Sequence, residues 1–296
     1  MPDQVMSDRA MPERAMPERP MPDRAMPDRS MPDRSWRRGW CLTAAVAVLA
    51  LAAGCGSAPE AAPAGGGSAG SRLSGTVTVF AAASLTETFG TLARRFEAEH
   101  PGVKIILNVG ASSALALQIS QGAPADVFAA AATANMDQLV RTGAVTAPSD
   151  FAGNVLQIAV PPANPARIGG LADLARPGVK VALCQAQVPC GAAGVAVLGN
   201  AGVRLTPVTL ESDVKATLTK VRTGEVDAGL VYVTDVRSAG SAVRGIAIPA
   251  AVNVRTVYPI GVLREARNRS AAQAFTAYVL SAAGQRVLAA AGFQPP

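Results

Sequence analysis

The sequence has one histidine, few aromatic residues and no cluster of basic residues, and each absence excludes a class of function. With His100 as the only histidine, a metal site lacks a plausible ligand set, and a serine nucleophile lacks a general base. A Gly-x-Ser-x-Gly turn is also missing, and paired carboxylates are lacking near the candidate binding residues described below. We therefore expect no enzyme and no cofactor. Because the net charge of +6 is scattered and only 4% of residues are aromatic, we expect no nucleic-acid surface.

The chain also lacks an apolar run long enough to cross a membrane as a stable helix, which needs about 20 residues. The apolar run Cys41–Gly54 has 14 residues and follows Arg37 and Arg38. This pattern predicts an export signal over residues 36–54.

The end of this signal, Ala52-Ala53-Gly54-Cys55, is similar to the lipobox of bacterial lipoproteins, in which cleavage before the cysteine leaves a lipid on it. An ordinary secretory signal cleaved nearby is the alternative. Residues 55–73 are rich in Ala, Gly, Pro and Ser, which is typical of a flexible tether. A lipid on Cys55 would anchor the protein to the membrane, with its folded part in water.

Residues 1–35 form seven pentapeptides in which Met, Pro, an acid and Arg recur. A proline in nearly every pentapeptide prevents a continuous helix, and the apolar content is too low for a core. We interpret this segment as disordered, or else translation starts at a later methionine such as Met31.

Cysteines are scarce, with four in the chain. If Cys41 is removed with the signal and Cys55 carries lipid, the exported domain keeps Cys184 and Cys190. Two cysteines six positions apart in an oxidising compartment favour a disulfide. A metal pair is the alternative, but further ligands are lacking.

From Thr76 onward, short β-rich runs alternate with amphipathic helical runs, which predicts parallel or mixed sheets covered by helices. Several strand ends lead into turns with hydroxyls or free N–H groups, at Ser84, Ser112, Cys190, Val214 and Tyr232. Because helix N-termini and the carboxyl ends of strands favour anions, these fragments predict an oxyanion site without lysine or arginine.

Four fragments carry a family resemblance: Val79–Thr86, Leu115–Phe128, Val188–Gly191 and Glu225–Tyr232. In order and spacing they resemble the molybdate-binding proteins of ABC importers, over essentially residues 75–296. The block Gly122–Phe128, Gly-Ala-Pro-Ala-Asp-Val-Phe, is strongly typical of that family.

The resemblance implies a two-lobed α/β fold of the periplasmic-binding type (type II), with mixed sheets flanked by helices and a ligand cleft between the lobes. Lobe 1 is expected to comprise residues 74–156 and 237–296, and lobe 2 residues 157–236. The implied function is extracytoplasmic capture of molybdate or tungstate and delivery to the membrane permease of an ABC importer. We expect a monomer.

The family's ligand contacts, carried over residue by residue, fall on the hydroxyls of Ser84 and Ser112, the backbone N–H groups of Cys190 and Val214, and the phenol of Tyr232. Ser113 is the alternative to Ser112, because the chain has Gly-Ala-Ser-Ser where the family usually has Gly-Ser-Ser-Gly. An alanine is usual at the position of Cys190, and the cysteine leaves the N–H unchanged.

Structural interpretations compete with these functional ones. Ser84 and Glu87 fit a capping box, and Val214 and Tyr232 fit core positions. Asp235 is expected to cap the helix that follows Tyr232, or to orient a neighbouring donor.

A site of neutral donors favours a fully deprotonated tetrahedral dianion. Phosphate, when protonated, would need an acceptor for its proton. Sulfate, another tetrahedral oxyanion and the alternative ligand, is smaller and would be held loosely by donors set for molybdate. A hydrolase is the remaining alternative function.

Overall fold

The structure, a computed structural model, describes residues 72–296. The predictions for residues 1–35, 36–54 and Cys55, and for most of the tether, lie outside the described residues. Among the described residues, no helix is both long and apolar enough to cross a membrane.

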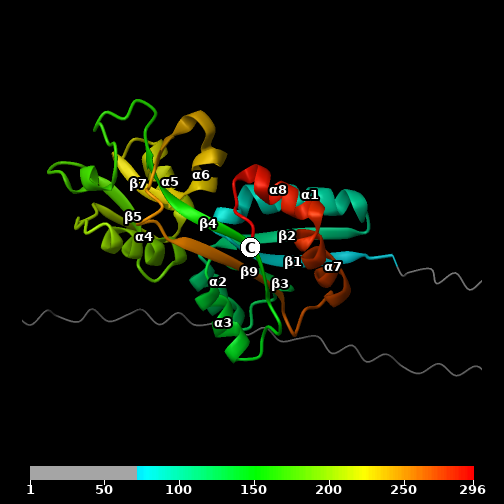
Figure 1. Cartoon of the computed structure of the whole chain (residues 1–296). Coiled ribbons are helices and arrows are strands. Elements are labelled where there is room, and N and C mark those ends of the chain that lie inside the picture. Colours follow the sequence, from blue (N-terminus) through cyan, green and yellow to red (C-terminus); the bar gives the residue numbers. More distant parts are fainter. Residues whose placement is uncertain (1–71) are drawn as a thin grey trace, which may run out of the picture. The chain divides into compact units, whose positions relative to one another are not determined.

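Strands and helices alternate along the described chain, as the hydrophobic pattern predicts (Figure 1). The strands are β1 (Gly75–Ala82), β2 (Val103–Gly110), β3 (Val127–Ala129), β4 (Ser149–Val160), β5 (Val181–Cys184), β6 (Thr209–Glu211), β7 (Ala228–Tyr232), β8 (Arg244–Ala247) and β9 (Arg255–Val262). The α-helices are α1 (Thr86–Glu99), α2 (Ser112–Ser120), α3 (Thr133–Arg141), α4 (Pro189–Asn200), α5 (Val214–Arg222), α6 (Val233–Ala239), α7 (Arg269–Leu280) and α8 (Ala282–Ala291). The short 3-10 turns are η1 (Ala83–Leu85), η2 (Leu171–Ala175) and η3 (Gly240–Ala242).

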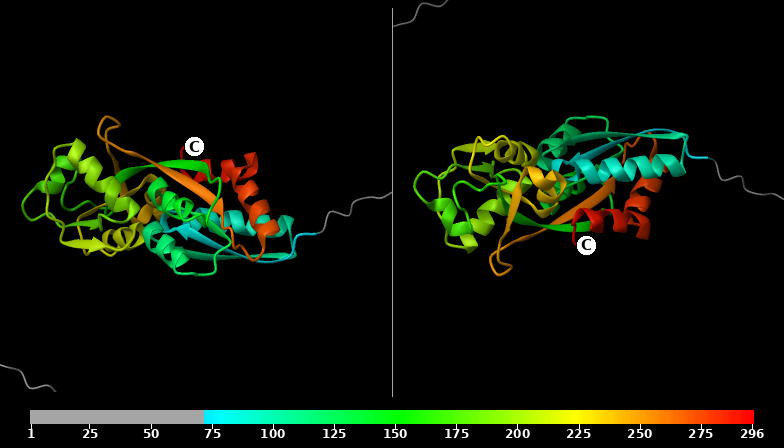
Figure 2. Two further views of the ribbon diagram at one scale, coloured as in Figure 1. Left: turned by 90° about the horizontal axis from the view of Figure 1, so that it is seen from below. Right: turned by 90° about the horizontal axis from the view of Figure 1, so that it is seen from above.

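Two long strands, β4 and β9, connect two lobes. In order, the strands run β2-β1-β3-β9-β4-β7-β5-β6, with β8 beside β4. The first half of β4 pairs antiparallel with β9, whereas Leu156–Ala159 pair with β7 and Gln157–Val160 with β8. Both views in Figure 2 show β4 and β9 passing from one lobe to the other. The chain therefore crosses between the lobes twice, as expected.

The boundary of the second lobe differs from the prediction. β8 was not predicted, and residues 237–254 were assigned to the first lobe. In the structure β8 pairs with the second-lobe part of β4, and Val243 and Ile248 belong to the second lobe's core. The return crossing is therefore β9. We refer to residues 75–155 and 255–296 as the first lobe and to residues 156–254 as the second.

The two lobes have cores of different composition. The seven phenylalanines all lie in the first lobe, where rings such as Phe89, Phe96 and Phe275 pack edge to face beside β9. The second lobe is filled by Val, Leu, Ile and Ala, and its one aromatic residue is Tyr232. Burial of these apolar side chains supplies the main favourable term in folding each lobe. The single aromatic ring of the second lobe lies at its edge toward the first.

The apolar residues over 270–290 recur at helical spacing, which predicts one helix, but the structure has two, α7 and α8. Ser281 ends α7 with an extended backbone, and its hydroxyl accepts a hydrogen bond from Gly284 N–H at 3.2 Å, which caps α8. A serine side chain competes with the helical backbone for hydrogen bonds, and this ends α7 at Ser281. The apolar periodicity does not show the break, because it continues from one helix into the next.

Candidate functional site

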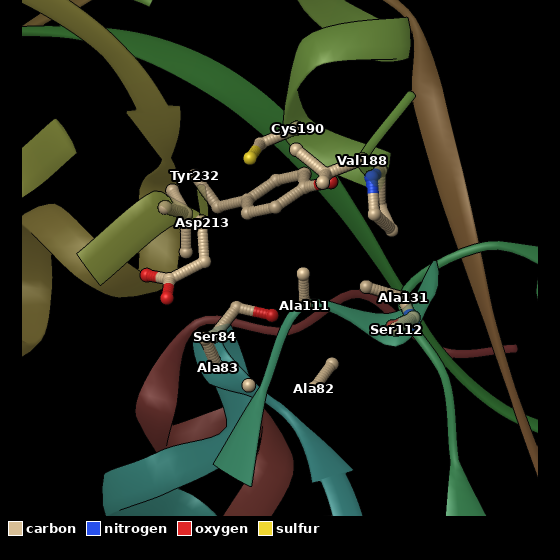
Figure 3. Close-up of a pocket in the computed structure, with 13 residues that line it drawn as sticks. Ala82, Ala83, Ser84, Ala111, Ser112, Ala131, Val188, Cys190, Asp213 and Tyr232 are labelled. Atoms are coloured by element: carbon tan, nitrogen blue, oxygen red, sulfur yellow. Dashed lines mark hydrogen bonds between the residues drawn. The ribbon is translucent and has the colours of Figure 1, made fainter. Parts of the chain in front are cut away.

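All five residues predicted to hold an anion line one cavity between the lobes (Figure 3). None of them is more than 4% exposed, so a ligand held there would be removed from water. The empty space at this site, including the part open to solvent, is about 220 Å³, so the cavity suits a small ligand. The remaining lining is mostly small and apolar: Ala82, Ala83, Gly110, Ala111, Ala131, Val188, Pro189 and Asp213.

Ser84 stands just past the carboxyl end of β1, in η1, and points into the cavity (Figure 3). Its hydroxyl lies 3.0 Å from the hydroxyl of Tyr258 on β9. The capping box with Glu87 does not form, because α1 has no side-chain cap and the Glu87 carboxylate pairs with Lys215 instead. The interpretation of Ser84 as a helix cap is therefore wrong. Its hydroxyl is oriented by a tyrosine from the crossing strand.

Ser112 is the first residue of α2 and lines the cavity, whereas Ser113 is only half-buried and does not. The Ser112 hydroxyl oxygen accepts a hydrogen bond from Ala131 N–H at 2.9 Å. A hydroxyl that accepts there still has its own proton to donate. The geometry thus favours Ser112 over Ser113 as the donor of this loop.

We expect Ser112→Ala to weaken anion binding about tenfold, roughly 1.5 kcal/mol, because a hydrogen bond to a charged acceptor is lost in a dry cavity. Ser113→Ala is the matched control in the next position and should bind like the parent. Isothermal titration of both variants with molybdate is the measurement. Equal losses of affinity in the two variants, or a loss confined to Ser113→Ala, would show that Ser112 is not the specific contact of this loop.

The disulfide predicted between Cys184 and Cys190 is present, with a Cα–Cα distance of 5.8 Å. It joins the end of β5 to the first turn of α4. Pro189 occupies the first position of α4, where its missing N–H costs nothing. The Cys190 N–H that follows has no backbone acceptor among the described residues. It is available to an anion at the positive end of the helix.

The second free N–H belongs to Val214, at the start of α5. The Asp213 carboxylate caps this helix by accepting from Lys215 N–H at 2.8 Å and Ala216 N–H at 3.0 Å. The N–H of Val214 itself has no acceptor within the described part of the chain. The cap thus pairs the next two donors of the turn, and Val214 N–H remains for a ligand.

Tyr232 ends β7, and its ring extends across the cavity (Figure 3). The hydroxyl is fully buried and makes no hydrogen bond within residues 72–296. Burial raises the pKa of the Tyr232 phenol well above its usual value. Thr256 and Tyr258 offset this only in part, and neither makes a hydrogen bond of ordinary geometry with it. The phenol therefore stays protonated as a neutral donor without an acceptor, which is costly unless a ligand supplies one.

Charged side chains contribute little to the cavity wall. Of the lining residues, Asp213 is the one with a charge, and no Lys, Arg or His is among them. In the described range no group of three or more His, Cys, Asp or Glu could hold a metal ion. Asp235 behaves as predicted: its carboxylate accepts from Tyr232 N–H at 3.1 Å, at the start of α6. The cavity can therefore hold a small anion by neutral donors from both lobes.

Comparison with known proteins assigns the family. Residues 77–294 match the family described as bacterial extracellular solute-binding protein. The chain belongs to this family. Membership confirms the predicted two-lobed binding fold and the prediction that the protein is not an enzyme.

Similar proteins agree with the resemblance found in the sequence. This solute-binding protein is 42% identical to the molybdate-binding protein ModA of Mycobacterium tuberculosis H37Rv over 256 residues, covering 86% of this chain and 97% of the relative. Its fold is similar to the periplasmic molybdate-binding protein of Azotobacter vinelandii, with a TM-score of 0.65, 21% identity and coverage of 74% and 99%. It is also similar to the sulfate-binding protein SubI of M. tuberculosis H37Rv, with a TM-score of 0.67, 20% identity and coverage of 74% and 86%. At these identities the two structures show the fold alone, and the fold does not choose between the anions.

Sequence reasoning missed the residues that support the donors of this solute-binding protein. Tyr258, Ala131 and Lys215 are distant in sequence from the side chains they contact: Tyr258 is 174 positions from Ser84. A local signal for these contacts does not exist, because each depends on where the fold places β9, the segment after β3, and α5.

Proposed function

We propose that this protein captures molybdate between its lobes and delivers it to the membrane permease of an ABC importer. Two findings support the proposal: the 42% identity to a relative named as molybdate-binding, and the five neutral donors around one cavity. Tungstate has the same charge and shape, so we propose it as an equivalent ligand.

One observation carries the proposal: the buried Tyr232 phenol is a donor that stays protonated and has no acceptor within the described residues. A fully deprotonated oxyanion supplies acceptors and no donors, so it fits a cavity whose free groups are all donors. Charge-assisted hydrogen bonds from such donors offset the loss of the anion's hydration.

Sulfate and phosphate are the competing ligands. Sulfate has the same charge but shorter bonds to oxygen, so the donors on opposite lobes would reach it less well. Protonated phosphate needs an acceptor, and Asp213 is the single lining carboxylate. Its Oδ1 is already engaged by two N–H groups. The other carboxylate oxygen of Asp213 could accept the phosphate proton. Phosphate is therefore the competitor that tests the choice of ligand most severely.

We expect titration calorimetry to show one site for molybdate or tungstate, with sulfate and phosphate binding much more weakly. Because the ligand binds the folded state, a hundredfold excess over Kd should also stabilise the protein by about 2.7 kcal/mol and raise its melting temperature. If phosphate or sulfate binds more tightly than molybdate, that anion is the ligand and the proposed ligand is wrong. An unchanged melting temperature with all four anions would overturn the function.

We further propose that the protein works outside the cytoplasm as a monomer, anchored by a lipid on Cys55. The export-signal pattern over residues 36–54 and the similarity of the sequence around Cys55 to a lipobox support this. Sedimentation of the full chain, and a comparison of its release from bacterial membranes by detergent and by salt, test both points.

A further inference from the structure

A lysine next to the anion cavity bridges the two lobes. Lys215 belongs to α5 of the second lobe, and its ammonium lies 2.8 Å and 3.0 Å from the two carboxylate oxygens of Glu87 on α1 of the first lobe. The same ammonium lies 3.0 Å from Oδ1 of Asp235 and 3.3 Å from the hydroxyl of Ser238, both in the second lobe. One cation therefore contacts carboxylates of both lobes.

We infer that Lys215 is a positioning residue for anion binding: it holds the lobes together over the cavity through Glu87 and so slows release of the ligand. This inference rests on the proposed function. Lys215 does not line the cavity, so it acts on the ligand only through the donors beside it.

The second-lobe end of this bridge is an ion pair: Asp235 Oδ1 lies 3.0 Å from the Lys215 ammonium, without the geometry of a hydrogen bond. Asp235 is fully buried, and its other carboxylate oxygen accepts from Tyr232 N–H. The backbone N–H of Lys215 donates to the Asp213 cap. Lys215 is thus tied to the elements that carry two of the three donors of the second lobe, Val214 and Tyr232, but not to α4, which carries Cys190.

The first-lobe end lies just as close to a donor. Glu87 follows Ser84 by three residues, at the start of α1. The ion pair therefore joins a residue next to Val214 with a residue one turn from Ser84. Separation of the lobes would break the Glu87 contact and leave the Asp235 contact intact, because Asp235 and Lys215 lie in the same lobe.

The charge needed for this bridge is retained. Burial of Lys215 lowers its pKa, but Asp235 and Glu87 raise it by more, so its pKa is higher than usual. Glu87 is 53% exposed and Lys215 is 24% exposed. Ion pairs with one exposed partner contribute modestly, so the effect on release should be a factor of a few and should shrink in high salt.

The test replaces Glu87 and leaves the buried pair intact, since removal of Lys215 would strand the Asp235 charge and could unfold the protein. Glu225→Gln is the matched control. Glu225 is 51% exposed and pairs at 2.6 Å with Lys220, which lies on α5 as Lys215 does. Both partners of this pair belong to the second lobe. Release of labelled molybdate into excess unlabelled molybdate is measured for the full chain and both variants. Small-angle scattering of each protein is recorded with and without molybdate.

Glu87→Gln should release molybdate about two to five times faster than the parent, and its scattering should shift toward more open lobes. Glu225→Gln should match the parent in both measurements. If the two variants behave alike, the bridge does not position the lobes, although the proposed function stands. If the parent binds no oxyanion, the proposed function fails, and scattering alone then decides the bridge: equal profiles for both variants overturn it.

Discussion

Gly191→Ala is expected to abolish measurable molybdate binding and to destabilise the protein by about 3 kcal/mol, because it overpacks a site that cannot relax. A Cβ at position 191 would lie 1.9 Å from the carbonyl oxygen of Gln185 and 2.8 Å from that of Cys184. Both atoms are backbone, and the disulfide closes the loop that carries them. The first turn of α4 would have to move, and the Cys190 N–H would move with it.

The matched control is Gly199→Ala, near the other end of the same helix. A Cβ there meets nothing within 4 Å, and the position is exposed. Alanine should therefore stabilise α4 by about 0.5–1 kcal/mol without changing affinity. Chemical denaturation and titration calorimetry measure both quantities. Normal molybdate binding by Gly191→Ala would show that the first turn of α4 does not hold the anion.

Tyr232→Phe is expected to separate binding from stability. Hydrogen bonds to charged groups contribute about 1.5–3 kcal/mol, so the loss of this donor should weaken molybdate binding by up to about a hundredfold. The ligand-free protein should be as stable as the parent or slightly more so, because the removed hydroxyl is buried and has no partner in the described structure. Thermal unfolding without ligand and calorimetric titration provide the two values.

Tyr278→Phe is the control, since Tyr278 lies on α7 and does not line the cavity. The pH dependence gives a second check on Tyr232. Because its pKa is raised, the phenol remains a protonated donor at pH 10, where an ordinary tyrosine is half ionised. The parent's affinity should therefore stay level up to pH 10. A loss of affinity centred at pH 10, or full affinity in Tyr232→Phe, would remove Tyr232 from the site.

The amino-acid sequence by itself determined most of the helices and strands of this protein, with β8 and the break at Ser281 as exceptions, and the places where donors occur. Hydrophobic periodicity, the turn after β1 and Pro189 at the start of α4 are signals that act within a few residues, and they placed Ser84 and Cys190 at helix starts. The Cys184–Cys190 disulfide could also be predicted from the sequence, since its two cysteines are six residues apart.

Only the tertiary structure decided which of these residues share a cavity and what orients them. Ser84 is held by Tyr258, 174 positions away, and Glu87 pairs with Lys215 across 128 positions instead of capping its own helix. Ser112 lines the cavity and Ser113 does not, because Ala131 N–H fixes one hydroxyl. Local propensities are set by neighbouring residues, whereas contacts between distant segments depend on how sheets and helices pack, so they form only once both lobes are in place.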